Sequence, residues 1–183
     1  MRIASTIAAG LAGLAGLLVL LALIGLLLPS ERTVSRSLAM QAPASVIYDH
    51  IADLREFHEW SPWAYRDPNM EVSFEGEDKG AGAIMYWDSE SEGSGRLEIL
   101  QAEPGAFIIY EIDFGAGQPA RGRFEIEPEG HRQRVTWSMT AQLDAIHWRY
   151  IGLFLDTMIG PDFLNGLTYL KMRVEAADSP FEQ

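Results

Sequence analysis

Histidine is the side chain most often used for proton transfer and metal binding near neutral pH, and in this sequence it is scattered. The four histidines are His50, His58, His131 and His147. No H-x-x-x-H, H-E-x-x-H or other carboxylate–histidine cluster surrounds them. We therefore expect surface histidines and no metal site.

Nucleophilic chemistry finds no better support in the residue pattern. Ser61 and Ser138 have no base at a meaningful spacing, and the sequence contains no G-x-S-x-G, G-x-G-x-x-G or P-loop motif. The absence of cysteine excludes thiol catalysis and disulfides. We predict no catalytic residue and no cofactor, so a non-catalytic protein is the expectation, while the sequence leaves open whether any reaction is catalysed.

Glu111 and Asp113 are two residues apart in a run of alternating apolar and polar residues, so they share one face of a predicted strand. A paired acid–base role would require that face to be buried. Because Ile108, Tyr110 and Ile112 occupy the opposite face, we expect the two carboxylates to be solvated.

The chain of 183 residues carries a net charge of −12, and Arg2 is the only charged residue before Glu31. The acidic surface of the remaining chain would repel phosphate backbones, so we expect no nucleic-acid partner. The length after residue 30 suffices for one domain with its own core.

The segment from Ile3 to Leu28 contains no charged residue and would span about 39 Å as a helix, against about 30 Å for a bilayer core. The apolar run is longer than that of a signal peptide and lacks a small-x-small cleavage site. We predict an uncleaved single-pass anchor over residues 1–30, and so a membrane protein. Flanking charges do not decide which side of the membrane the domain occupies.

Ala9, Gly13 and Gly16 lie on roughly one side of this predicted helix. Such small residues allow close helix contacts, which would give weak self-association through the anchor. A lone anchor rich in glycine and alanine is the preferred alternative.

The rest of the chain predicts an α+β domain over residues 31–177, with a flexible tail over 178–183. A strand over 33–40 is followed by a short helix or two, beginning with one over 44–54, and the apolar period becomes two from Met70 onward. About six strands follow, each with one dry and one wet face, as in an antiparallel sheet covered on one side. Gly160-Pro161-Asp162 predicts the start of a long C-terminal helix.

Four motifs in this order resemble the START-like superfamily, also called SRPBCC or polyketide cyclase/dehydrase-like. They are LREFHEWSPWAYRDPNM, GSGRLEI, EPEGHRQRVTWSMTAQ and DTMIGPDFLNGLTYLK, and the resemblance covers nearly all of residues 34–175. It implies a helix-grip fold, in which a curved antiparallel sheet of six or seven strands wraps a long C-terminal helix. It also implies a hydrophobic cavity between them. It says little about activity, since one fold hosts many functions.

In such a fold the dry faces of the strands become both core and cavity wall. The expected ligand-binding, cavity-lining residues are Trp63, Tyr86, Tyr110, Phe124, Trp137, Met139, Phe163 and Leu167. Arg121 is a candidate polar contact to an anionic headgroup at the cavity mouth, although charge balance on an acidic surface is the preferred explanation. Tyr86 and Trp87 are neighbours, so only one of them can point inward.

The stretch EWSPWAYRDPN holds two of the five tryptophans of the chain. Pro62 cannot lie inside a regular helix or a central strand, so the stretch leaves the short helices and enters the next strand. We expect Trp60 to plug these helices onto the sheet and Trp63 to form a wall or gate of the cavity.

Three functions fit these expectations. The first is a membrane-anchored domain that binds or carries an apolar small molecule, lipid-like or polycyclic, in its cavity without catalytic machinery. The second is a cyclase or dehydratase of the polyketide type, which would place at least one buried polar residue, such as Tyr110 or Arg121, in the cavity. The third is a protein-interaction module tethered to the membrane, which would combine a filled core with one exposed apolar patch.

Overall fold

The computed structural model of the chain describes residues 2–115 and 119–177. The predicted tail over 178–183 lies outside them. Seven strands form one sheet: β1 (Glu31–Met40), β2 (Glu71–Gly76), β3 (Ala83–Ser89), β4 (Gly93–Glu103), β5 (Phe107–Asp113), β6 (Ala120–Glu129) and β7 (Arg132–Gln142). Six helices accompany it: α1 (Arg2–Leu27), α2 (Ala44–Ala52), α3 (Leu54–Trp60), α4 (Pro62–Arg66), α5 (Ile146–Gly152) and α6 (Leu155–Ala177).

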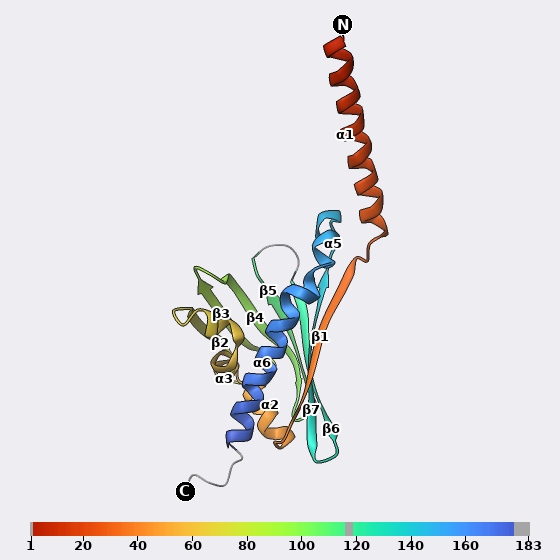
Figure 1. Cartoon of the computed structure of the whole chain (residues 1–183). Helices are drawn as coiled ribbons and strands as arrows, with labels where there is room; N and C mark the ends of the chain where they lie inside the picture. The colour runs from red at the N-terminus through yellow and green to blue at the C-terminus, as the bar shows by residue number, and fades with distance from the viewer. Residues whose placement is uncertain (1, 116–118, 178–183) are drawn as a thin grey trace.

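Every strand of the sheet pairs antiparallel with its neighbours, in the order β1-β7-β6-β5-β4-β3-β2. The long β2-to-β7 meander therefore returns to the first strand, which pairs with the last one. The sheet curves around α6, and α2 and α3 pack on the same side (Figure 1). This is the helix-grip fold of the α+β class, as the sequence predicts.

Residue alternation builds the dry face of the sheet. Along β5, Ile108, Tyr110 and Ile112 are buried, while their neighbours are only partly covered. The same alternation buries Phe124 on β6 and Trp137 on β7. These side chains meet the buried face of α6, so one core lies between the sheet and the helix.

The sequence predicts one or two short helices after β1, and the structure divides the predicted range 44–54 at Asp53, between α2 and α3. Asp53 adopts an extended backbone conformation between α2 and α3, and its carboxylate accepts a hydrogen bond from the Arg55 amide at 2.9 Å. Ser61 likewise precedes α4, whose first turn contains Pro62. The Ser61 hydroxyl accepts a hydrogen bond from the Trp63 amide at 3.3 Å. Ser61 is thus a helix cap.

The C-terminal helix begins earlier than predicted. It starts at Leu155 and contains Pro161, although Gly160-Pro161-Asp162 has the residue types of a helix start. Leu155 and Ile159 pack against the core, and Asp156 pairs with Arg36 on β1 at 2.8 Å. These contacts of the first turns offset the hydrogen bond that proline cannot donate.

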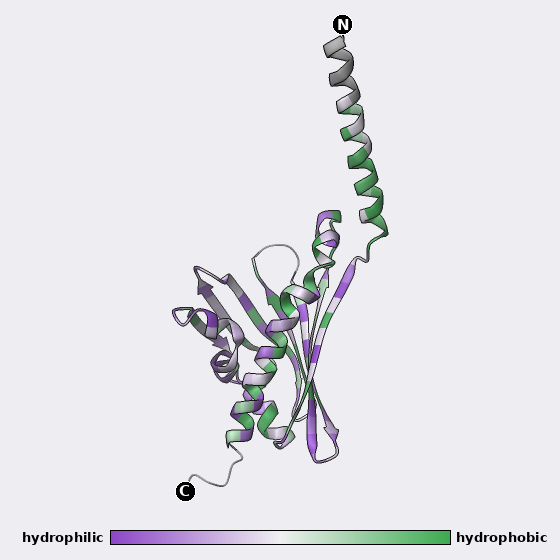
Figure 2. Cartoon of the chain, viewed as in Figure 1, coloured by the Kyte–Doolittle hydropathy of each residue, from purple (hydrophilic) through white to green (hydrophobic). Residues whose placement is uncertain are grey.

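Helix α1 projects away from the domain, with its C-terminal end beside α5 (Figure 1). Its side chains from residue 10 to residue 27 are apolar and almost all exposed (Figure 2). By length and composition, it is the helix within the described residues that could cross a membrane.

Candidate ligand cavity

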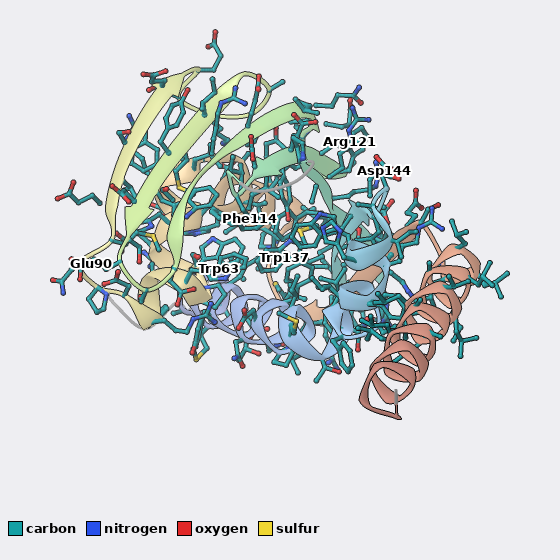
Figure 3. The ribbon with its side chains drawn as sticks, turned by 90° about the horizontal axis from the view of Figure 1, so that it is seen from above. Trp63, Glu90, Phe114, Arg121, Trp137 and Asp144 are labelled. Atoms are coloured by element: carbon teal, nitrogen blue, oxygen red, sulfur yellow. The ribbon has the colours of Figure 1, made fainter. Side chains whose placement is uncertain are left out.

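A cavity of about 220 Å³ lies between the concave face of the sheet and the first half of α6. Its walls are mostly apolar and come from β3, β4, β5, β7, α3, α4 and α6. Figure 3, seen from the α1 side of the domain, shows Trp63, Phe114 and Trp137 together between the sheet and α6. An apolar concave site with few polar groups is the usual form of a small-molecule site.

Trp137 organises the aromatic wall of this cavity. Its ring stacks on Phe163 of α6, with ring centroids 4.3 Å apart and planes 6° apart. On its other side it stacks on Phe124, with centroids 4.8 Å apart. Trp63 approaches it edge-on at 5.8 Å. The indole therefore has fixed neighbours on several sides and presents a rigid surface.

Two buried residues with hydroxyl groups, Tyr110 and Ser61, line the cavity, and Tyr110 makes a side-chain contact with the aromatic wall. Its oxygen accepts a hydrogen bond of 2.7 Å from Trp137 Nε1. Burial raises the pKa of the Tyr110 phenol well above its usual value, so the group is neutral at physiological pH. A phenol that accepts one bond retains a proton to donate, and it can donate that proton to an acceptor oxygen of a ligand.

Gly122 makes room for this tyrosine. It faces Tyr110 across the β5–β6 register, and a Cβ atom on it would lie 1.9 Å from Tyr110 Cζ. Any larger residue at position 122 would push the phenol ring out of its position. The position of the hydroxyl group thus depends on a glycine in the middle of a strand.

Arg66 joins the elements along a polar part of the cavity wall. Its guanidinium donates to Glu92 at 2.7 Å and to Asp162 of α6 at 2.6 Å. Both acids line the cavity, and their side chains are only 18% exposed. The hydrogen bond from Arg66 holds the pKa of Glu92 below its usual value. The ion-pair network therefore ties the β3–β4 turn to α4 and α6.

His58 lies on the wall near this network, on α3. Burial lowers the pKa of its imidazole, although the nearby Glu59 acts in the opposite direction. The neutral form, which can accept a proton, is therefore favoured at neutral pH. Within the described residues, no three His, Asp or Glu side chains are grouped so that they could hold a metal ion.

The structure places five of the residues expected from the sequence on the cavity wall. They are Trp63, Tyr110, Trp137, Met139 and Phe163. Trp60 instead is fully buried, and its Nε1 donates to the His50 carbonyl at 2.8 Å. The geometry thus separates the two tryptophans of the EWSPWAYRDPN stretch.

Four expected residues lie elsewhere. Tyr86 points to the outer face of β3, because its neighbour Trp87 takes the inward position. Phe124 and Leu167 do point inward, but other core side chains cover them. Arg121 is on the outer face of β6, where its side chain is 71% exposed and lies 3.8 Å from Glu111 (Figure 3).

Several wall residues were missing from the sequence-based set. Strand alternation alone indicates Leu97, which shares the parity of Ile99 on β4, and Ile112, which shares the parity of Tyr110 on β5. His58, Glu92 and Asp162 line the cavity because α3, α6 and the β3–β4 turn meet there in space, and no local sequence pattern signals that meeting.

A family comparison agrees with this geometry. The sequence model of the family described as "Polyketide cyclase / dehydrase and lipid transport" matches residues 31–175. The chain belongs to this family. The match covers the whole sheet and nearly all of α6, and leaves α1 outside.

Solved structures show the same fold at low sequence identity. The di-domain ARO/CYC protein StfQ from the steffimycin biosynthetic pathway superposes with a TM-score of 0.61 at 12% identity, over 80% of this chain and 51% of StfQ. DynU16, from the dynemicin biosynthetic locus, gives 0.58 at 14% identity, over 79% of this chain and 48% of its own. Protein MLL2253 from Mesorhizobium loti gives 0.58 at 15% identity, over 81% of this chain and 100% of its own.

The chain spans about half the length of DynU16 and of StfQ, so these similarities concern only part of each of the two larger proteins. Comparison with curated protein sequences finds no significant match. The comparisons therefore give the polyketide cyclase/dehydrase and lipid transport family and its fold, and the choice of function rests on the site.

Proposed function

We propose that this member of the polyketide cyclase/dehydrase and lipid transport family is a membrane-anchored domain that binds or carries an apolar small molecule in its cavity. The observation that carries the proposal is the cavity of about 220 Å³ between the sheet and α6, whose walls are mostly apolar. Transfer of apolar ligand surface from water into such a space is favourable by about 25 cal/mol per Å².

The shape and chemistry of the walls limit the ligand class. The cavity is smaller than the roughly 300–1,000 Å³ typical of sites for drug-sized ligands, so it suits a small apolar molecule or one end of a longer one. The stacked rings of Trp137 and Phe163 favour flat or acyl-like groups. The Tyr110 hydroxyl favours a ligand with one oxygen acceptor.

The anchor forms the second half of the proposal. Helix α1 is long and apolar enough to cross a bilayer, and the window from residue 10 to residue 27 has a mean hydropathy of 2.6. A tether of this kind would hold the cavity near a reservoir of apolar molecules.

Binding of a fluorescent apolar probe with a carbonyl group tests the cavity. The Met139→Trp variant puts a larger side chain on the wall and should abolish binding, whereas Met172→Trp, on an exposed position of α6, should leave it unchanged. Circular dichroism checks that both variants fold, because an inserted indole in a packed site costs about 1–3 kcal/mol. Equal probe binding by both folded variants would contradict the proposal.

A second function, a cyclase- or dehydratase-type enzyme acting in the same cavity, is favoured by one observation. A neutral imidazole, His58, and a neutral phenol, Tyr110, both line the space where a substrate would lie. His58 could take a proton from a carbonyl substrate as a base, while the Tyr110 hydroxyl keeps its proton and donates a hydrogen bond to the carbonyl oxygen. Turnover of a polyketide-like substrate that is lost in both His58→Ala and Tyr110→Phe would support this function over carriage alone.

A further inference from the structure

Four large apolar side chains are exposed where α5 meets α6. They form the junction patch, which consists of Ile151 (38% exposed), Leu153 (47%), Phe154 (61%) and Met158 (61%). Asp156 is the only charged residue from position 151 to position 159, and Arg36 on β1 neutralises it at 2.8 Å. Exposed apolar side chains gathered in this way usually mark a contact surface.

The junction patch begins in the last turn of α5, the helix that packs on α1. Tyr150 Oη on α5 donates to the Leu21 carbonyl at 2.5 Å, and Arg149 Nη1 donates to the Leu26 carbonyl at 3.2 Å. Ile146 approaches Gly25 so closely that a Cβ atom there would lie 2.3 Å from Ile146 Cγ2. Helix α5 is therefore fixed against the last two turns of α1 (Figure 1).

These contacts set the depth of α5 relative to a bilayer. Leu21 lies six residues before the end of α1, which corresponds to about 9 Å along the helix axis. The uncharged segment from Ile3 to Leu28 would be about 39 Å long as a helix, which exceeds a hydrocarbon core of about 30 Å by about the same 9 Å. If α1 spans the bilayer, α5 lies at the level of the headgroups and the first acyl carbons.

The residue types suit that depth. Trp148 and Tyr150 are the aromatic side chains that concentrate at membrane interfaces. Arg149 satisfies carbonyl groups at the C-terminal end of α1, which have no partner within that helix. Because the chain is acidic overall, electrostatic attraction to anionic lipid does not explain a contact between α5 and the membrane. Insertion of apolar side chains into neutral lipid does explain it.

The cavity opens at the same end of the domain. Ile159, next to Met158 of the junction patch, lines the cavity, and so does Phe114, which is 46% exposed at the end of β5. Figure 3 looks onto this end and shows Phe114 with Trp63 and Trp137 between the sheet and α6. The junction patch thus borders the route into the cavity.

We propose that the junction patch inserts into the surface of the lipid bilayer beside α1 and presses the cavity mouth onto the membrane. An apolar ligand then passes between the acyl chains and the cavity without crossing water. This inference rests on the proposed anchoring of α1, and its occupant is the bilayer in which α1 itself would sit.

Because the chain has no cysteine, single labels can be placed at will. The full chain is reconstituted into phosphatidylcholine vesicles with an environment-sensitive dye on Met158→Cys, Met172→Cys or Leu23→Cys. Met158 and Met172 are matched, since both are exposed methionines of α6, 61% and 56%, about 21 Å apart along the helix. Nitroxide-labelled phosphatidylcholine serves as the quencher.

The expected result is a blue-shifted emission that nitroxide lipid quenches at Met158→Cys and at Leu23→Cys, with neither effect at Met172→Cys. Adding Phe154→Glu to the Met158→Cys variant should remove both the blue shift and the quenching at that position. Adding Phe154→Glu to the Leu23→Cys variant should leave both effects unchanged. Quenching at Leu23→Cys without quenching at Met158→Cys would overturn the docking alone and leave the anchor in place. The absence of quenching at Leu23→Cys would overturn the anchor and, with it, the docking.

A second copy of the chain is the competing occupant of the junction patch. It would give a blue-shifted Met158→Cys signal that nitroxide lipid does not quench and that weakens as the protein is diluted in lipid. That pattern would also overturn the proposal. Quenching that is independent of the protein-to-lipid ratio supports it.

Discussion

The pair Trp60→Ala and Trp63→Ala separates the structural tryptophan from the cavity tryptophan. Trp60 is 0% exposed and lies edge-on to Phe57 at 4.8 Å and to Trp137 at 5.8 Å. Removal of a fully buried aromatic side chain costs about 3–5 kcal/mol. Trp63 is half-buried and contacts the cavity, so its removal should cost about 1 kcal/mol, the average for point substitutions.

The Trp60 value also includes a lost hydrogen bond. Its Nε1 donates to the His50 carbonyl, and such a bond contributes about 1 kcal/mol net. Since domains of this size are stable by about 5–15 kcal/mol, Trp60→Ala should remove a large part of the stability. With a urea dependence of about 2 kcal/mol per M, the unfolding midpoint should fall by about 2 M for Trp60→Ala and by about 0.5 M for Trp63→Ala.

Urea titrations in a fixed concentration of non-ionic detergent provide the assay. Far-ultraviolet circular dichroism is the suitable readout, because each variant deletes one of the five tryptophan fluorophores. Folded Trp63→Ala should also bind an apolar probe about tenfold more weakly, which corresponds to one aromatic contact of about 1.4 kcal/mol. Equal midpoints for the two variants, or unchanged probe binding by Trp63→Ala, would refute the assigned roles.

Three further predictions concern polar groups of the cavity wall. Tyr110→Phe leaves the buried Trp137 N–H without its acceptor and should lower the free energy of unfolding by about 1–3 kcal/mol in a urea titration; no change would contradict the hydrogen bond. Arg66 lowers the pKa of Glu92, so wild type should be more stable than Glu92→Gln by a constant amount above about pH 4.3, and this difference in unfolding free energy should vanish as the pH falls through the lower folded-state pKa. A stability difference that persists in acid would contradict the ion pair. Because burial lowers the pKa of His58, an NMR titration of its imidazole should have a midpoint below about 6.5, and wild type should lose stability relative to His58→Gln as the pH falls below that value. An NMR midpoint above about 6.5 would contradict the burial of this side chain.

The sheet could be predicted from the sequence because its signal is local. Each strand alternates apolar and polar residues, and the period of two assigns Tyr110, Trp137 and Met139 to the dry face without knowledge of the fold. The order of elements and the four motifs then gave the helix-grip architecture. The same parity does not decide between Tyr86 and Trp87, since the two are adjacent aromatic residues on β3 and either could have pointed inward.

Depth within the core is not a local property. Phe124 and Tyr110 have the same parity on neighbouring strands, yet the phenol lines the cavity and Phe124 is covered by Trp137. Which of two inward side chains borders the empty space depends on how the rings stack, and this is settled only by tertiary packing.

The start of α6 shows how a tertiary contact can override a local signal. Asp162 follows Pro161 in the pattern of a helix start, but it lies within α6. Its carboxylate accepts a hydrogen bond of 2.6 Å from Arg66 of α4. Asp156 had no explained role in the sequence, and its partner Arg36 is 120 residues away along the chain. Long-range ion pairs of this kind leave no trace in sequence spacing.

Native mass spectrometry of the full chain, purified from membranes in mild detergent, tests the central claim most directly. We expect wild type to carry one apolar molecule per chain, Met172→Trp to carry the same molecule, and the folded Met139→Trp variant to carry none. Wild type that is free of ligand and takes up no apolar molecule when lipid extract is added would contradict the account.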